Sequence, residues 1–377
     1  MRNSCTYKLA GPVTFRRSSS KILPEKNKRN VGWGSNLQNI EKSLREVYIP
    51  DGFSPSLEEK CLHWLEHRDL SIFTEEELAK LRCFAQTDQS GAEALIVAYD
   101  CEAMHYRQLF INNVKPHVYA GLRLFPEVWP KKAAEHGFNI TQETVDELCD
   151  TPIPKLKLNP YWRELDLLIK DSDHWPLTER YYYFAKQTIH SFSYGIQWHT
   201  FIGNVLEKSG GRIVLTPDQG KHFLSTIRNV FPEVPDRCKR IESQVKAGGI
   251  LYNMFGHPYT IWPGGSPPDC VCSDMKEFFA WGPQSTVGEI TRTAFSRMQE
   301  YIEGESKPYD ILADTHDSYL VQFPLADVDD CTTKMKEFMS AVEFTSPIDG
   351  AKFRMKSETK IGFSWGDCSK RHPLGLR

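Results

Sequence analysis

The chain has a long helix-forming middle with strand-forming segments on both sides of it, and this order limits its fold more than any other feature. Residues 101–205 and 217–247 carry apolar residues at helical spacing. Strands are expected at 84–87 before this block, and at 309–315, 318–323 and 353–361 after it. We therefore expect a mixed α+β chain, with a helical block inserted between β-containing ends. Breaks in the helical block are expected at Pro126, Pro130, residues 152–160, Pro232 and Pro235.

Further elements follow from local signals. Residues 54–83 read as helical, with Thr74 as N-cap and Glu77 at the capping-box position. The remaining expected elements are a strand at 47–49, helices at 92–99, 273–303 and 327–342, and a hairpin at 250–262.

The composition excludes several classes of protein. The chain has 377 residues, of which 40% are hydrophobic and 12% aromatic, enough to fill a sizeable core. No stretch approaches the roughly 18 apolar residues of a membrane span, and the first residues lack the apolar region of a secretory signal, so a cytoplasmic protein is expected. A net charge of −3 argues against a surface that wraps nucleic acid all round, but is compatible with a basic cleft.

Two aspartates stand where rigid backbone could hold a cation. Asp88 follows a short strand and precedes a helix, and Asp317 lies at the tip of an expected hairpin over residues 311–321. Phosphoryl transfer to a hydroxyl needs hard divalent cations, which prefer a few carboxylates together with water and substrate oxygens. Taken alone, either aspartate is better explained as a turn residue than as a metal ligand.

A third group of residues lies at helical spacing. Lys186, His190 and Tyr194 are four residues apart and share one face of a helix, and Gly195 follows. A cation, an imidazole and a phenol on one face suit an anionic ligand that carries a flat ring. The alternative is an amphipathic surface helix whose aromatic residues pack inward.

Together these segments resemble the polymerase module of family A DNA polymerases, the bacterial DNA polymerase I group. Residues 88–95 resemble that family's D-x-S-x-x-E-x-R motif, and residues 186–195 its fingers-helix motif ending in Tyr-Gly. Further similarities, in the family's order along the chain, are residues 14–20 (T-G-R-x-S-S), 35–40 (N-L-Q-N-I), 280–286 (N-A-P-x-Q-G-T), 315–318 (V-H-D-E) and 361–367 (G-x-x-W).

The resemblance implies specific roles. Asp88 and Asp317 would hold two Mg²⁺ ions, with the backbone carbonyl of Gln89 as a further ligand. Lys186 would contact the triphosphate of an incoming dNTP, and Glu93 would exclude a 2′-hydroxyl. The remaining implied contacts are His190, Tyr194, Gly195 and Arg180 with the dNTP, and Arg16, Asn36, Gln38, Gln284 and His316 with primer-template DNA.

The chain departs from the family pattern at several positions. The family's arginine four residues before the lysine is Tyr182 here, and Arg180 is the expected substitute. His190 stands where the family has Phe or Tyr. Further departures are Leu95 for Arg, Ala280 for Asn and Ser318 for Glu.

The resemblance also predicts a domain organisation. An antiparallel-sheet palm would comprise residues 1–100, with a helical insertion at about 54–83, and residues 250–377. The fingers would comprise residues 101–249. Because Arg16 comes so early, we expect a right-hand polymerase without thumb or exonuclease domain. A separate polypeptide would supply both, as in a bacteriophage-type split polymerase working in the bacterial host cytoplasm.

Three alternatives remain at this point. Asp100 could replace Asp88 in the first motif, but it lacks the serine two residues later and the glutamate five residues later, so Asp88 is preferred. A single-subunit RNA polymerase would share the two aspartates and the lysine helix. A non-catalytic DNA-binding subunit derived from a polymerase would have no need to keep Asp88, Asp317 and Lys186 together.

Overall fold

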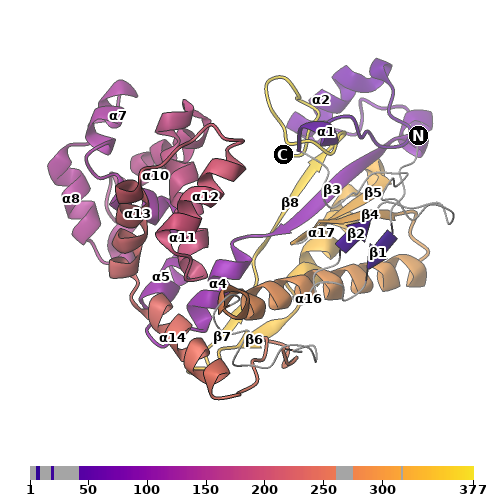
Figure 1. The fold of residues 1–377 in the computed structure, drawn as a ribbon. Coiled ribbons are helices and arrows are strands. Elements are labelled where there is room, and N and C mark those ends of the chain that lie inside the picture. Colours follow the sequence, from indigo (N-terminus) through magenta and orange to yellow (C-terminus); the bar gives the residue numbers. More distant parts are fainter. Residues whose placement is uncertain (1–5, 9–17, 21–41, 260–274, 316) are drawn as a thin grey trace.

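A four-stranded antiparallel sheet forms the base of one lobe of the molecule (Figure 1). The computed structural model describes residues 6–8, 18–20, 42–259, 275–315 and 317–377. The strand order is β4-β5-β3-β8. Strands β3 and β8, the first and the last of this sheet along the chain, therefore pair directly. The bounds are β3 Arg82–Gln89, β4 Asp310–Thr315, β5 Ser318–Pro324 and β8 Ser357–Gly362.

The two faces of this sheet differ because side chains alternate along each strand. One face carries Tyr319, Val321 and Phe323, which pack with α16 (Met275–Gly304) and α17 (Val328–Met339) in one hydrophobic core. The other face carries Phe84 and Leu320, which Trp365 partly covers, while Asp88 is exposed on it. The helices therefore seal one face and leave part of the other open.

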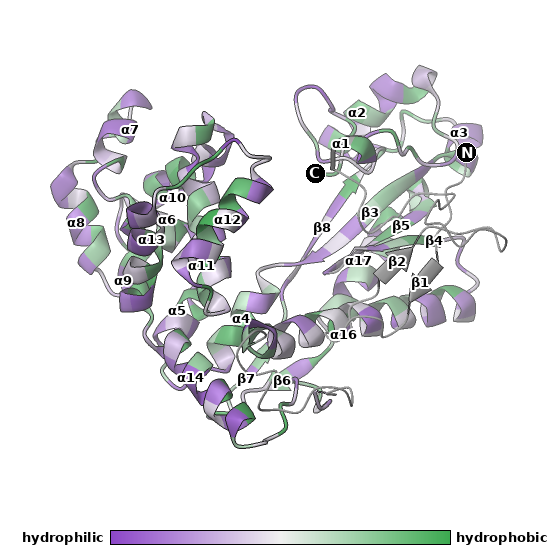
Figure 2. Cartoon of the chain, viewed as in Figure 1, coloured by the Kyte–Doolittle hydropathy of each residue, from purple (hydrophilic) through white to green (hydrophobic). Residues whose placement is uncertain are grey.

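The second lobe is helical and has a core of its own (Figure 1). Helices α6 and α13 pack on α11, and all three turn apolar residues inward. Hydrophobic and hydrophilic stretches alternate along these helices, as amphipathic packing requires (Figure 2). The bounds are α5 His105–Ile111, α6 Pro116–Leu124, α7 Trp129–Glu135, α8 Gln142–Asp150, α9 Ile153–Leu156, α10 Trp162–Asp171, η3 Ser172–His174, η4 Leu177–Glu179, α11 Tyr181–Ser193, α12 Trp198–Lys208, α13 Pro217–Val230 and α14 Glu233–Lys246.

Smaller elements complete the chain. Their bounds are β1 Thr6–Lys8, β2 Ser18–Ser20, α1 Lys42–Arg45, η2 Pro55–Leu57, α2 Glu58–His67, α3 Glu75–Lys80, α4 Ala92–Tyr99, η5 Leu325–Asp327, β6 Glu343–Thr345 and β7 Lys352–Arg354. In the described part of the chain, no helix is long and apolar enough to cross a membrane.

Helix α4 connects the lobes through a buried ion pair at its C-terminus. Asp100 accepts hydrogen bonds from Arg237, at 2.6 Å from its Nε, and from Arg240, also at 2.6 Å. The Arg237 side chain is 1% exposed and also donates to the carbonyl of Phe279. The ion pairs therefore fasten α14 to the end of α4.

The α+β expectation is confirmed, and most elements fall where the sequence predicts them. Helix α4 has the predicted bounds, α16 nearly so, and Thr74 and Glu77 form the predicted capping box. Residues 54–83 hold the helices η2, α2 and α3, and α3 begins after the predicted N-cap, but β3 already begins at Arg82.

Four local predictions are wrong. Residues 47–49 form no strand, since Val47 and Ile49 are exposed and Pro50 follows. The predicted strand at 353–361 is two strands, because the carbonyl of Lys356 bonds to the amide of Ser90 instead of continuing a ladder. Pro130 and Pro235 lie in the first turns of α7 and α14, where a missing N–H costs nothing.

The predicted hairpin at 250–262 is reduced to a bridge between Tyr252 and Pro258 in its described part. The side chain of Asn253 accepts hydrogen bonds from the amides of Phe255 and His257, both at 3.0 Å. This local capping closes the turn early, and Pro258 has no N–H to extend a ladder.

The buried ion pair predicts a large stability effect. Asp100→Ala leaves the Arg237 guanidinium buried without its carboxylate, so the free energy of unfolding should fall by about 3 to 5 kcal/mol. Urea unfolding measures it. The control is Asp236→Ala on α14, the helix that carries Arg237. The exposed ion pair of Asp236 with Lys239 should contribute about 1 kcal/mol or less. Equal effects of the two substitutions would contradict the assignment.

Candidate active site

Asp88 and Asp317 meet at one end of the sheet. Asp88 is the penultimate residue of β3 and lies opposite Ser318, the first residue of β5. Asp317 directly precedes Ser318, and its carbonyl accepts a hydrogen bond of 3.1 Å from the amide of Gln89. The pairing of β3 with β5 therefore brings together two carboxylates that are 229 positions apart in the sequence.

The surroundings of Asp88 disfavour its negative charge. Its side chain lies in a hollow of about 170 Å³, shared with Arg45, Glu358, Lys360 and Trp365. The hollow admits water, but the protein around it reduces the hydration of the carboxylate. This burial first, and the like charge of Asp317 second, raise the pKa of Asp88 to about 7.

The donor set fits a divalent cation. Two carboxylates held close together repel one another, and a cation between them would remove that repulsion. Among the described residues, no cluster of three or more His, Cys, Asp or Glu side chains forms a metal site. Asp88 and Asp317 would therefore leave coordination positions for water and substrate oxygens, as Mg²⁺ prefers.

Glu93 ties the start of α4 to the end of α11. It lies in the first turn of α4, five residues after Asp88, and accepts a hydrogen bond from the Tyr194 hydroxyl. Gly195 follows with φ of +64°, and a Cβ there would approach the ring of Phe279 to 3.2 Å. Glycine is therefore required at this turn. These contacts bring α11 to the aspartate end of β3.

Helix α11 presents the predicted face. Lys186 and His190 are exposed, and the His190 ring packs edge-on against Tyr194 with ring centroids 5.2 Å apart. Tyr194 itself is buried. The opposite side of the helix, with Phe184 and Ile189, enters the helical core. The cation and the imidazole thus point out of the lobe, while the phenol is held by Glu93.

Other predicted residues have different surroundings. Arg180 precedes α11, and its Nε donates to the carbonyl of Trp175 at 3.1 Å. Gln284 lies half-buried on α16. The Gln89 side chain turns into the core and donates to Thr291 at 2.7 Å, so only its backbone is available at the aspartates. Four predicted DNA contacts lie outside the described residues, namely Arg16, Asn36, Gln38 and His316.

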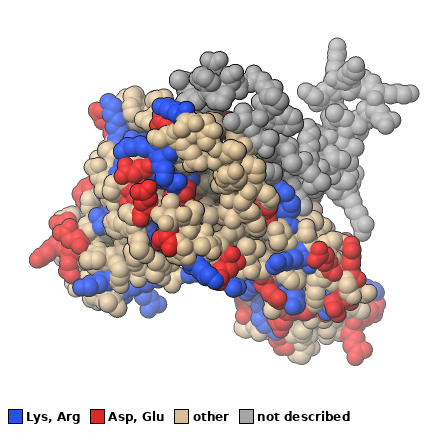
Figure 3. Space-filling view, turned by 90° about the horizontal axis from the view of Figure 1, so that it is seen from below, with Lys and Arg blue, Asp and Glu red and all other residues tan. Residues whose placement is uncertain are grey.

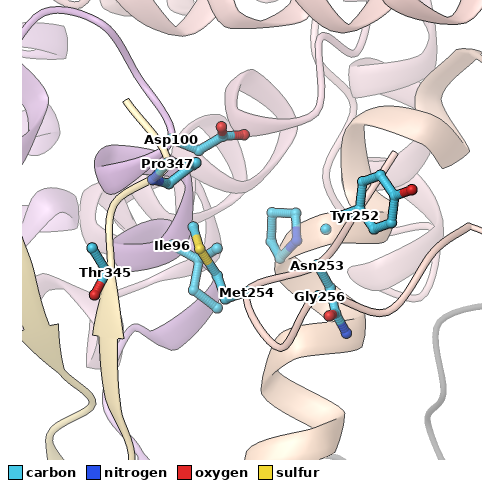
Figure 4. A pocket seen from close by; sticks show the side chains of 10 residues that line it. Ile96, Asp100, Tyr252, Asn253, Met254, Gly256, Thr345 and Pro347 are labelled. Atoms are coloured by element: carbon cyan, nitrogen blue, oxygen red, sulfur yellow. The ribbon is translucent and has the colours of Figure 1, made fainter. Parts of the chain in front are cut away.

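A larger cavity, of about 270 Å³, lies apart from this site (Figure 4). It is lined by Ile96 of α4, by Asp100 directly after that helix, by Tyr252 and Asn253 of the capped turn, and by Thr345 of β6. Asp100, the alternative first-motif aspartate, lies here with its ion-pair partners. None of the predicted site residues lines this cavity, so the candidate chemistry is placed at the smaller hollow.

The sequence did not single out Arg45, Glu358 and Lys360, which share the hollow with Asp88, and it marked Trp365 only as part of the G-x-x-W segment. Glu358 lies opposite Asp88 in the ladder of β3 with β8. The alternation Glu358-x-Lys360 could have flagged two charges on one strand face, but only the sheet order shows that β8 lies beside β3.

Comparison with known proteins agrees with this architecture at the level of the fold. No family model and no curated protein sequence matches the chain. A solved structure with a similar fold is the POL domain of Pol1 from M. smegmatis, in complex with DNA primer-template and dNTP. The TM-score is 0.59 at 14% sequence identity, over 96% of this chain and 48% of that chain. The chain thus has a polymerase-like fold and spans about half the length of its structural neighbour.

The raised pKa of Asp88 predicts a pH-dependent stability. Folded Asp88 binds its proton with a pKa of about 7, against about 4 when unfolded, so metal-free stability should fall as pH rises through this window. Asp317→Asn removes one cause of the shift. It should raise Tm at pH 8, and change it little at pH 5, where Asp88 already holds its proton.

Thermal unfolding in the presence of a chelator measures this difference. The control is Asp310→Asn, an exposed carboxylate on the neighbouring strand β4, which should have a small effect that is equal at the two pH values. A Tm that drops at pH 8 in Asp317→Asn would show that the two carboxylates do not repel.

Proposed function

We propose that the chain is the catalytic core of a template-directed DNA polymerase that adds dNTPs to a primer 3′-hydroxyl. The observation that carries this proposal is the convergence of Asp88 and Asp317 beside a helix that presents Lys186 and His190. The fold supports it, since the mycobacterial neighbour was solved with primer-template and dNTP.

We assign the sheet lobe, residues 1–100 and 250–377, to the palm, and residues 101–249 to the fingers. The separate hydrophobic cores support this division, since one consists of residues within 97–234 and the other joins residues 57–99 to residues 287–363. The expectation of a separate thumb and exonuclease polypeptide, and of a bacteriophage-type enzyme, stays a prediction.

The proposed roles are those that the family resemblance implies. Asp88, Asp317 and the Gln89 carbonyl would hold two Mg²⁺ ions, which supply a lowered pKa for the primer hydroxyl and charge neutralisation for the leaving pyrophosphate. Lys186 would bind the triphosphate and hold a proton for the leaving group. Glu93, fixed by Tyr194, would crowd the sugar at C2′. His190 would lie under the nucleotide.

The surface charge is compatible with a local rather than a general DNA-binding face. Lys, Arg, Asp and Glu are interspersed on the face seen in Figure 3, which shows no broad basic track there. DNA binding would therefore depend on the residues around the aspartates more than on net charge.

Primer extension tests the catalytic assignment. Asp88→Ala or Asp317→Ala should lower single-nucleotide incorporation by at least about a thousandfold, the scale expected when a metal-held transition state is lost. Asp310→Ala, an exposed aspartate on β4, serves as control and should stay within a fewfold of wild type. A decrease of only a fewfold in both active-site variants would mean that other carboxylates carry the reaction.

Sugar selection tests the choice of DNA over RNA polymerase. Glu93→Ala opens the space next to Tyr194, so incorporation of rNTPs relative to dNTPs should rise by about tenfold or more. Glu93→Gln keeps the bulk and should lie closer to wild type. The measurement is competitive incorporation of matched rNTP and dNTP. Wild-type use of rNTPs as efficient as that of dNTPs would favour the RNA polymerase alternative.

A further inference from the structure

A second lysine lies beside Lys186 on a neighbouring helix. Lys208 is the last residue of α12, and this helix packs against α11. The Lys208 Nζ donates a hydrogen bond of 3.0 Å to Oε1 of Gln187, the residue that follows Lys186. The Lys208 side chain therefore reaches back over α11 and brings its ammonium group to the outward face of that helix.

Among the described residues, no carboxylate forms an ion pair with either Lys186 or Lys208. Partial burial and then the charge of Lys186 lower the pKa of Lys208, while the smaller effects of Glu207 and Glu93 raise it. Two like charges that share a site without a carboxylate are stabilised by an anion.

The contact between Tyr194 and Glu93 indicates toward which part of the molecule the lysine pair faces. Glu93, which Tyr194 holds at the start of α4, is close enough for its charge to act on Lys208. Lys186 lies on the same helix face as Tyr194, and the Tyr194 hydroxyl binds Glu93 of α4, so this face of α11 leads to the helix that follows Asp88. An anion bound there would extend from the helical lobe toward Asp88 and Asp317.

The two other positions near Lys186 where a second cation was expected make different contacts. Arg180 is bonded through Nε to the carbonyl of Trp175. Tyr182, one turn before Lys186, has no charge, and its ring packs edge-on against His117 with centroids 5.7 Å apart. Its backbone amide donates to Ser172. Lys208 of α12, by contrast, has its ammonium group at the residue that follows Lys186.

We propose that Lys208 binds the triphosphate of the incoming nucleotide together with Lys186. This inference rests on the proposed function and assigns a further binding residue to it. Gln187 holds the Lys208 ammonium group in place before the ligand arrives. Because Lys208 binds the triphosphate without taking part in proton transfer, its loss should raise KM for the dNTP more than it lowers kcat.

Equilibrium binding tests the inference without any turnover. The full chain is titrated with inorganic tripolyphosphate and with a dNTP, each at low and at physiological salt. Lys208→Ala should weaken binding of both probes about tenfold, the effect of one charge-assisted contact. Lys208→Arg keeps the charge and should restore most of the affinity. Lys239→Ala removes an exposed lysine on α14, away from Lys186, and should change nothing.

A second measurement excludes a merely structural role. Tm of Lys208→Ala should equal that of wild type, and its primer extension should show KM for the dNTP raised about tenfold with kcat changed less than about threefold. A decrease in kcat alone, or an equal loss in Lys208→Ala and Lys208→Arg, would overturn the assignment.

The outcomes separate the two proposals. If wild type extends primers and Lys186→Ala loses dNTP affinity while Lys208→Ala does not, Lys208 is not a triphosphate ligand and the polymerase proposal stands. If wild type extends no primer but binds tripolyphosphate in a Lys208-dependent way, the anion site stands and the polymerase proposal fails. If wild type binds neither probe, the lysine pair is not an anion site.

Discussion

The antiparallel pairing of β3 with β5 is the constraint on which the rest of the structure depends. It sets Asp88 opposite Ser318 and so places Asp317 beside Asp88, where one carboxylate disfavours the ionisation of the other. A chain that only needed to fold would gain nothing from this repulsion. It becomes useful when a cation is bound there, because the same closeness then stabilises the metal-bound state. Without a metal, the two carboxylates thus repel one another, and a bound divalent ion would remove this repulsion.

The helical lobe depends on the same strand through α4. This helix begins three residues after β3 ends, and its two termini perform different tasks. Near its start, Glu93 accepts a hydrogen bond from the Tyr194 hydroxyl and so fixes the end of α11. At its end, Asp100 forms ion pairs with Arg237 and Arg240 of α14. One short buried helix therefore sets how the lysine face of α11 stands relative to the aspartates. The Asp100 ion pairs have a structural task, which agrees with the choice of Asp88 for the metal.

Local signals were sufficient to predict the elements that carry the site, but not the contacts between them. The strand at Asp88, the bounds of α4, the hairpin around Asp317 and the face of α11 all follow from periodicity and turn chemistry. Partners distant in sequence do not: nothing local shows that Asp100 meets Arg237, that Glu358 of β8 faces Asp88, or that Lys208 reaches Gln187. The wrong strand at 47–49 and the divided strand at 353–361 have the same cause, because tertiary hydrogen bonds and exposure overruled local propensity there.

The central claim is that Asp88 and Asp317 together hold divalent ions beside a bound nucleotide. Counting Mn²⁺ ions by electron paramagnetic resonance, in the complex of the chain with a dideoxy-terminated primer-template and a matching dNTP, tests it most directly. We expect two ions per chain in wild type, and a loss of tight binding when both aspartates are replaced by asparagine. The same number and affinity of bound ions in wild type and in the double variant would contradict the account.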